Sequence, residues 1–225
     1  MYPEGLFRTP LGDLEIDKEF TKNLLYQDKD IFFEPVAFEK EHSLEVQLPF
    51  LQKTLSNFKI VPVVMGDCSF STCQKLADLL KEAIGKRQDV LVVASTDMYH
   101  GYDYEELEVI DNLTLPYLKN MDAQGLYDGL REGRLQLCGG FPVVSTLILA
   151  KTLGHNKLKV LTHTNSAEVT GKKAKGIWTV GYASCVIDQE KGEVAMLSKE
   201  QRKKLLVIAR NSIDIFKDRG KITTY

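Results

Sequence analysis

The 225-residue sequence lacks the features that mark membrane, secreted or nucleic-acid-binding proteins. Its longest apolar runs, such as residues 89–94, are far shorter than the roughly 20 residues that span a bilayer. The first residues have neither the basic nor the apolar region of a signal peptide. With 29 basic and 31 acidic residues, there is no basic excess for nucleic acid or an anionic membrane surface. We therefore expect a cytoplasmic protein that binds neither.

Cysteine is also scarce. The four cysteines, Cys68, Cys73, Cys138 and Cys185, are too few and too scattered for a disulfide framework. The spacing of Cys68 and Cys73 is not that of a zinc knuckle, so a functional cysteine would act as a single thiolate. The sequence also lacks a Gly-x-Ser-x-Gly, a Walker and a Rossmann motif. These absences exclude several large enzyme classes.

Hydrophobic periodicity predicts alternating helices and strands. Helices are expected over residues 18–25, 42–55, 76–83, 104–121, 122–131 and 142–153, and strands over residues 31–38, 58–65, 89–96, 157–162 and 177–187. Ser71 and Gln74 match a capping box, and Pro49 should kink or restart its helix. Residues 89–96 do not alternate, as expected of a strand covered on both faces. This pattern predicts an α/β fold with a largely parallel or mixed sheet, with Trp178 and Tyr182 in its core.

The polar stretch 188–193 predicts a domain boundary. Residues 1–190 would form one domain, and residues 191–225 a linker and the first helix of a second, truncated domain. Ser198 and Gln201 match another capping box, followed by an apolar stripe from Leu206 to Phe216. A lone amphipathic helix has nothing of its own to pack against, which favours the start of a further domain.

Two polar side chains directly follow the strand expected at residues 89–96. Asp97 and His100 lie where open α/β sheets bind ligands, outside the carboxyl ends of the strands. They are close enough in sequence to share one pocket. Alternatively, Asp97 caps the next helix and His100 is an ordinary loop histidine.

A second pair, His42 and Glu45, is three residues apart and would share a helix face. A histidine and a carboxylate at this distance can orient each other in a site. Taken alone, the pair is more typical of a solvated first helical turn.

The third candidate is Cys138, which precedes Gly139, Gly140 and a predicted helix. The positive end of a helix favours a thiolate, the form that binds metals and attacks electrophiles. The two glycines leave the backbone open to close approach. The alternative is a small buried hydrophobe, the role expected of the other three cysteines.

Taken together, these segments resemble the Memo family over about residues 3–187. The resemblance rests on four motifs in order: Thr9-Pro-Leu-Gly-Asp13, Glu41-His-Ser-Leu-Glu-Val-Gln-Leu-Pro49, Ser95-Thr-Asp-Met-Tyr-His100 and Cys138-Gly-Gly-Phe-Pro142. Residues 197–216 resemble the opening helix of an AMMECR-type domain. Memo is protein B of the AmmeMemoRadiSam system, which implies an AMMECR-type domain and a radical SAM protein as partners.

The resemblance implies a fold like that of class III extradiol dioxygenases, which hold iron with two histidines and a carboxylate. In Memo a cysteine replaces the carboxylate, and Cys138 matches that position. His100 matches the acid/base histidine with Asp97 beside it, while His42, with Glu45 near it, is expected to line the pocket. The metal would be iron or copper. Both histidine ligands belong to motifs upstream of Thr9, so we expect a chain truncated at its N-terminus.

Two functions follow from this resemblance. One is a metal-dependent oxidoreductase acting on an unknown small molecule. The other is a non-catalytic metal-binding or protein-interaction module that works with a radical SAM partner. The expected loss of the first strands would also leave an apolar sheet edge exposed and the chain poorly soluble.

Overall fold

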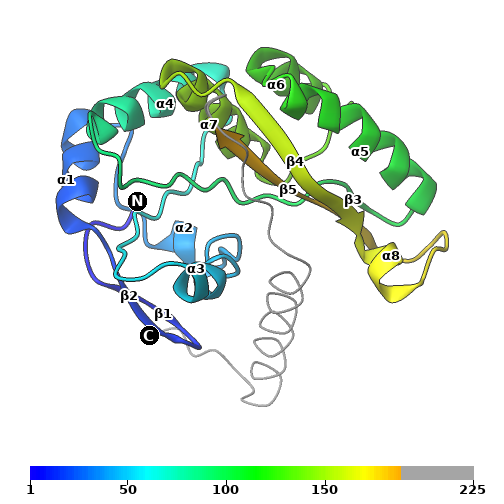
Figure 1. Cartoon of the computed structure of the whole chain (residues 1–225), viewed down its shortest axis with the longest axis horizontal. Helices are drawn as coiled ribbons and strands as arrows, with labels where there is room; N and C mark the ends of the chain where they lie inside the picture. Colours follow the sequence, from blue (N-terminus) through cyan, green and yellow to red (C-terminus); the bar gives the residue numbers. More distant parts are fainter. Residues whose placement is uncertain (189–225) are drawn as a thin grey trace. The chain divides into compact units, whose positions relative to one another are not determined.

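A computed structural model describes residues 1–188. They fall into two compact units, residues 1–64 and residues 65–188. Figure 1 shows the elements of each unit. The helix expected after Ser198 and the second domain expected at residues 191–225 lie outside the described residues.

The first unit begins with a hairpin. Strands β1 (Leu6–Thr9) and β2 (Gly12–Glu15) pair in antiparallel fashion, and residues 9–12 form the turn between them. Gly12 has a φ of 121°, which favours glycine there. Helix α1 (Lys18–Gln27) confirms the helix expected at residues 18–25. It begins after Asp17, whose carboxylate accepts a hydrogen bond from the Phe20 amide at 3.0 Å.

Two other predictions for this unit are wrong in extent or type. The helix expected at residues 42–55 is only α3 (Leu48–Thr54), with Pro49 in its first turn. A helix running through Pro49 would clash with the Glu45 carbonyl, so the predicted restart is confirmed. Residues 31–38 form no strand and contain only the short helix α2 (Val36–Glu39). Phe32 and Val36 are exposed, so the apolar composition of this segment does not reflect a buried strand.

A three-stranded antiparallel sheet is central to the second unit. Its order is β3 (His100–Gly101), β5 (Thr179–Asp188) and β4 (Lys157–Asn165), and β4 and β5 form the long ribbon pair in Figure 1. Both strands expected near the end of the chain are therefore confirmed. The expected largely parallel or mixed sheet is wrong for the described strands, which all pair in antiparallel fashion. The short α8 (Ser166–Thr170) and its loop return the chain along β4 as a hairpin partner instead of crossing the sheet.

Helices flank this sheet. Helix α5 (Tyr104–Lys119) packs on β4 and β5, followed by α6 (Ala123–Arg131) and α7 (Gly140–Thr152), so all three expected helices are confirmed. The chain thus has a mixed α/β fold with small sheets and flanking helices. No helix in the described part of the chain is long and apolar enough to cross a membrane.

Helix α4 (Phe70–Ile84) packs against α7 and forms a second part of the core. Cys73 and Ala77 of α4 and Val144 and Leu147 of α7 are buried. The helix is capped by Ser69, whose hydroxyl accepts from the Thr72 amide at 3.2 Å, not by the predicted Ser71. A serine two residues earlier fits better because it has the extended backbone of an N-cap residue.

The strands expected at residues 58–65 and 89–96 are absent from the described structure. Only Ile60 makes an isolated parallel bridge, to Ile16. Leu91 is 65% exposed and Val93 47% exposed, so the expectation of a strand covered on both faces is wrong. A non-alternating apolar run is stable as a strand only when neighbouring strands and two covering layers are supplied. The exposed apolar run is a site where self-association can begin.

We expect Leu91→Lys to reduce self-association without changing stability. Because Leu91 is largely exposed, the substitution should alter the free energy of unfolding by less than about 0.5 kcal/mol. A charge within a β-prone apolar run opposes strand-to-strand aggregation. Light scattering against protein concentration measures the effect, with urea unfolding as the stability check. Val109→Lys, at an exposed apolar position on α5, is the control. An equal reduction in Val109→Lys would mean that net charge, not residue 91, governs association.

Candidate metal centre

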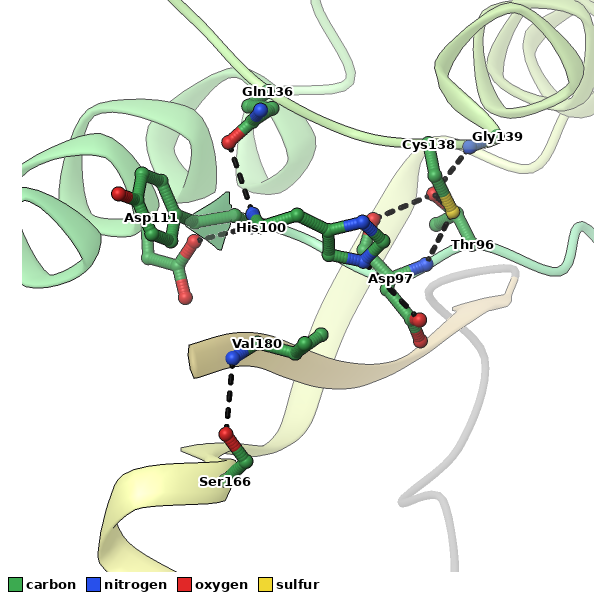
Figure 2. Close-up of polar contacts among 10 residues, drawn as sticks. Thr96, Asp97, His100, Asp111, Gln136, Cys138, Gly139, Ser166 and Val180 are labelled. Atoms are coloured by element: carbon green, nitrogen blue, oxygen red, sulfur yellow. Dashed lines mark hydrogen bonds and ion pairs between the residues drawn. The ribbon is translucent and has the colours of Figure 1, made fainter. Parts of the chain in front are cut away.

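Two loops of the second unit are joined by hydrogen bonds at the candidate centre. One contains Asp97 and leads into β3, and the other contains Cys138 and leads into α7. The Cys138 amide donates to the Asp97 carbonyl at 3.1 Å, and the Asp97 amide donates to the Cys138 Sγ at 3.0 Å. This reciprocal pair fixes the thiol against the start of the Asp97 loop, and Figure 2 shows the contact between the Asp97 amide and the Cys138 sulfur.

Thr96 joins the same two loops. Its hydroxyl oxygen accepts from the Gly139 amide at 2.8 Å, and its hydroxyl donates to the Asp97 carbonyl at 2.8 Å. A Cβ on Gly139 would lie 2.3 Å from the Ser95 carbonyl oxygen, so only glycine allows this approach. The expectation that the glycines open the backbone next to Cys138 is thus confirmed at Gly139.

His100 completes the cluster. Its Nε2 lies 3.3 Å from the Asp97 Oδ2, and its backbone amide donates to the Gln136 side-chain oxygen at 3.0 Å. Pairing of His100 with Val180 in the sheet fixes the backbone that bears the ring. One ligand atom each from Asp97, His100 and Cys138 lies within 4.8 Å of the others (Figure 2). The structure therefore brings together three of the five candidate residues.

This donor set suits a transition metal. Thiolate and imidazole bind iron, copper and zinc well, whereas magnesium and calcium prefer oxygen donors. Ligand atoms around one tetrahedral ion are roughly 3.3–3.8 Å apart, as bond lengths of about 2.0–2.3 Å require. Donors within 4.8 Å can reach that geometry through small side-chain movements. Cys138 is exposed and Asp97 and His100 are half-buried, so an ion can enter from solvent.

Residues 1–186 match the sequence profile of the Memo-like protein family. The chain belongs to the Memo family. It is 34% identical over 181 residues to a MEMO1 family protein of Caldivirga maquilingensis, covering 80% of this chain and 63% of that protein. It is 35% identical over 186 residues to one of Methanobrevibacter smithii, covering 82% and 64%, and 37% identical over 185 residues to one of Saccharolobus solfataricus, covering 80% and 63%. The chain therefore spans less than two thirds of the length of these Memo relatives.

Trp178 borders the candidate centre of this Memo-family chain, so the expectation that it is a core residue is wrong. It is 52% exposed, and its ring centroid lies 6.0 Å from that of His100 and 4.9 Å from that of Tyr102. Tyr182 is also exposed, although partial burial and the negative Asp97 carboxylate raise the pKa of its phenol. The expected core role is wrong for both residues: Tyr182 occupies an exposed position of β5, and Trp178 directly precedes that strand and is exposed.

His42 and Glu45 lie in the first unit. The His42 Nδ1 is 2.7 Å from the Glu45 Oε1, and both side chains are largely exposed. The two side chains therefore contact each other, and their exposure fits the solvated pair that was the alternative expectation. They precede α3 rather than lying inside a helix. Their role in the pocket of the Memo domain stays a prediction.

The cysteines differ as the sequence suggested, with one exception. Cys73 is buried, and burial raises the pKa of its thiol, so it packs as a neutral side chain. Cys68 is half-buried. Cys185 is exposed, so its expected role as a buried hydrophobe is wrong. Among the described cysteines, only Cys138 lies in a cluster with a histidine and a carboxylate.

Three contributors to the centre carried no signal of their own in the sequence. Thr96 lay within a recognised motif, but its bridging role depends on the contact with Gly139. Gln136 has the composition of an ordinary loop residue, and Trp178 that of a core aromatic.

His100 also borders a pocket of about 560 Å³, whose walls include Leu130, Leu135, Gln136 and Phe141.

Proposed function

We propose that this Memo-family chain is a metal-dependent oxidoreductase, related to class III extradiol dioxygenases, that binds iron or copper through Cys138. The observation that carries the proposal is that the Cys138 thiol lies beside a histidine–carboxylate pair, with one polar atom each of Cys138, His100 and Asp97 within 4.8 Å of the others. Titratable and metal-binding groups concentrated in one accessible place are typical of a functional site.

Each residue has a separate role in this proposal. Cys138 supplies the thiolate ligand, and the Asp97 amide that donates to its Sγ stabilises negative charge on sulfur. His100 acts as general acid and base, and Asp97 orients its ring through the 3.3 Å contact at Nε2. The bound metal would supply Lewis-acid and one-electron chemistry. Remaining ligand positions would be filled from outside the three-residue cluster.

The choice between iron and copper depends on the thiolate. Sulfur in place of a carboxylate oxygen shifts preference towards softer ions, which makes copper an alternative to iron. The substrate would be a small molecule. Partnership with an AMMECR-type domain and a radical SAM protein in the AmmeMemoRadiSam system is part of the proposal and follows from the family resemblance alone.

Metal content tests the proposal directly. The chain would be loaded anaerobically with Fe(II) or Cu(I), desalted and analysed by mass spectrometry. We expect near-stoichiometric metal in the wild type, loss of metal in Cys138→Ser, and no change in the control Cys185→Ser, which removes another exposed thiol. Absence of metal, or binding that is indifferent to Cys138, would overturn the metalloenzyme and leave the non-catalytic interaction module.

A further inference from the structure

The loop that carries Asp97 and His100 is fixed from its inner side. Met98 and Tyr99, which separate the two site residues, are both buried. The Met98 amide donates to the Gly181 carbonyl at 2.9 Å, and the Gly181 amide donates to the Tyr99 carbonyl at 2.8 Å. The Tyr99 amide donates to the Asp111 Oδ1 at 3.1 Å. A single carboxylate thus completes the support of the loop.

Asp111 is an unusual residue in this position. Its side chain lies on α5 and is 0% exposed, whereas aspartate is almost never fully buried without partners. Its second oxygen, Oδ2, lies 2.9 Å from the Nε2 of His163 on β4. Both carboxylate oxygens therefore have a partner, which offsets the cost of removing the group from water.

The backbone of β5 makes room for this carboxylate because residue 181 is a glycine. A Cβ at Gly181 would lie 2.1 Å from the Asp111 Oδ2. Three elements, α5, β4 and β5, thus converge on one buried group directly behind the loop that bears Asp97 and His100. Figure 2 shows Asp111 to the left of His100 and Cys138 to the right, near Asp97.

We propose that Asp111 and His163 are positioning residues of the candidate metal centre. Asp111 fixes the Tyr99 backbone and so holds His100 beside Asp97, and His163 holds the Asp111 carboxylate in place. The same contacts keep the Asp97 amide within reach of the Cys138 Sγ. The expected effect of Asp111 and His163 on metal binding rests on the proposed function, whereas their effect on the position of His100 does not.

Asp111→Ala, Asp111→Asn and the control Thr114→Val separate positioning from general packing. Thr114 is also buried on α5, but its hydroxyl donates only to the Ile110 carbonyl of its own helix. In Asp111→Asn the amide oxygen still accepts from the Tyr99 amide, and the other histidine tautomer lets His163 accept from the new NH₂. We therefore expect Asp111→Asn to restore what Asp111→Ala removes.

Two measurements follow each variant. The first needs no metal: NMR cross-relaxation between the His100 and Trp178 rings, whose centroids are 6.0 Å apart. The second is Co(II) affinity. We expect Asp111→Ala to lose the ring contact. We also expect it to bind Co(II) about tenfold more weakly, because the Asp97 amide is no longer held against the Sγ of the ligand Cys138, and tenfold is the lower end of the range for an outer partner of a metal ligand. Asp111→Asn and Thr114→Val should resemble the wild type in both.

The outcomes distinguish this inference from the proposed function. An unchanged His100–Trp178 contact in Asp111→Ala overturns the positioning role, whatever happens to Co(II). Loss of that contact in a chain whose wild type binds no Co(II) supports positioning and overturns the metal function. If Asp111→Ala does not fold, His163→Leu replaces it, since His163 is partly exposed and its loss releases the Asp111 Oδ2, so that the carboxylate no longer holds the Tyr99 amide in a fixed place. A ring contact unchanged in His163→Leu overturns the role of His163 and of the pair.

Discussion

Cys138→Ser is expected to weaken Co(II) binding more than about 100-fold, because losing a direct ligand costs more than losing an outer partner. His100→Gln should weaken it less than about threefold, since the His100 ring contacts the Asp97 carboxylate and its proposed role is proton transfer rather than metal binding. The sulfur-to-cobalt absorption band, followed in competition with a chelator, reports both affinity and the presence of the thiolate.

Two further variants serve as controls for this comparison. Asp97→Asn removes the carboxylate but keeps the backbone amide that donates to the Cys138 Sγ, so Co(II) affinity should stay close to that of the wild type. Cys185→Ser tests a second exposed thiol. If His100→Gln or Asp97→Asn loses as much affinity as Cys138→Ser, those residues are ligands. The cluster would then be a three-ligand site, and the acid/base assignment would be wrong.

Elements whose stability is local were predictable from the sequence. Helices α5, α6 and α7 appeared where apolar spacing and composition placed them, because a helix satisfies its own backbone hydrogen bonds. Strand predictions succeeded for β4 and β5, which are hairpin partners of each other. They failed at residues 31–38 and 89–96, where apolar composition was present but no paired strand accompanies it in the described structure. An apolar, β-branched composition favours a strand, but the strand forms its backbone hydrogen bonds only when another strand lies beside it.

The candidate centre was predictable only in part for a similar reason. Asp97, His100 and Cys138 were found because each follows or precedes a regular element in a recognisable motif. Asp111 lies within α5 among other acidic residues, and in sequence it resembles one more solvated helix position. Its burial depends on β4 and β5, which come more than 45 residues later. Nothing local in the sequence indicates that contact.

Gly181→Ala should therefore test this hidden part of the structure with a large effect. Gly181 lies in extended backbone, so the new methyl group causes no backbone strain. It would instead lie 2.1 Å from the Asp111 Oδ2 and force that carboxylate away from Tyr99 and His163. Overpacking of this kind typically costs about 1–3 kcal/mol. Because the carboxylate would also lose buried hydrogen bonds, we expect the free energy of unfolding to fall by about 3 kcal/mol. Urea unfolding measures it.

Gly66→Ala is the matched control, because its Cβ would meet no atom within 4 Å and its backbone needs no positive φ. That change should alter stability by less than about 1 kcal/mol. A double-mutant cycle identifies the contact: in an Asp111→Ala background the carboxylate is gone, so Gly181→Ala should cost at least about 1 kcal/mol less than in the wild type. An equal cost in both backgrounds would place the clash elsewhere and remove Gly181 from the support of the His100 loop. A reduced cost would mean that β5 carries glycine at this position to admit the buried carboxylate.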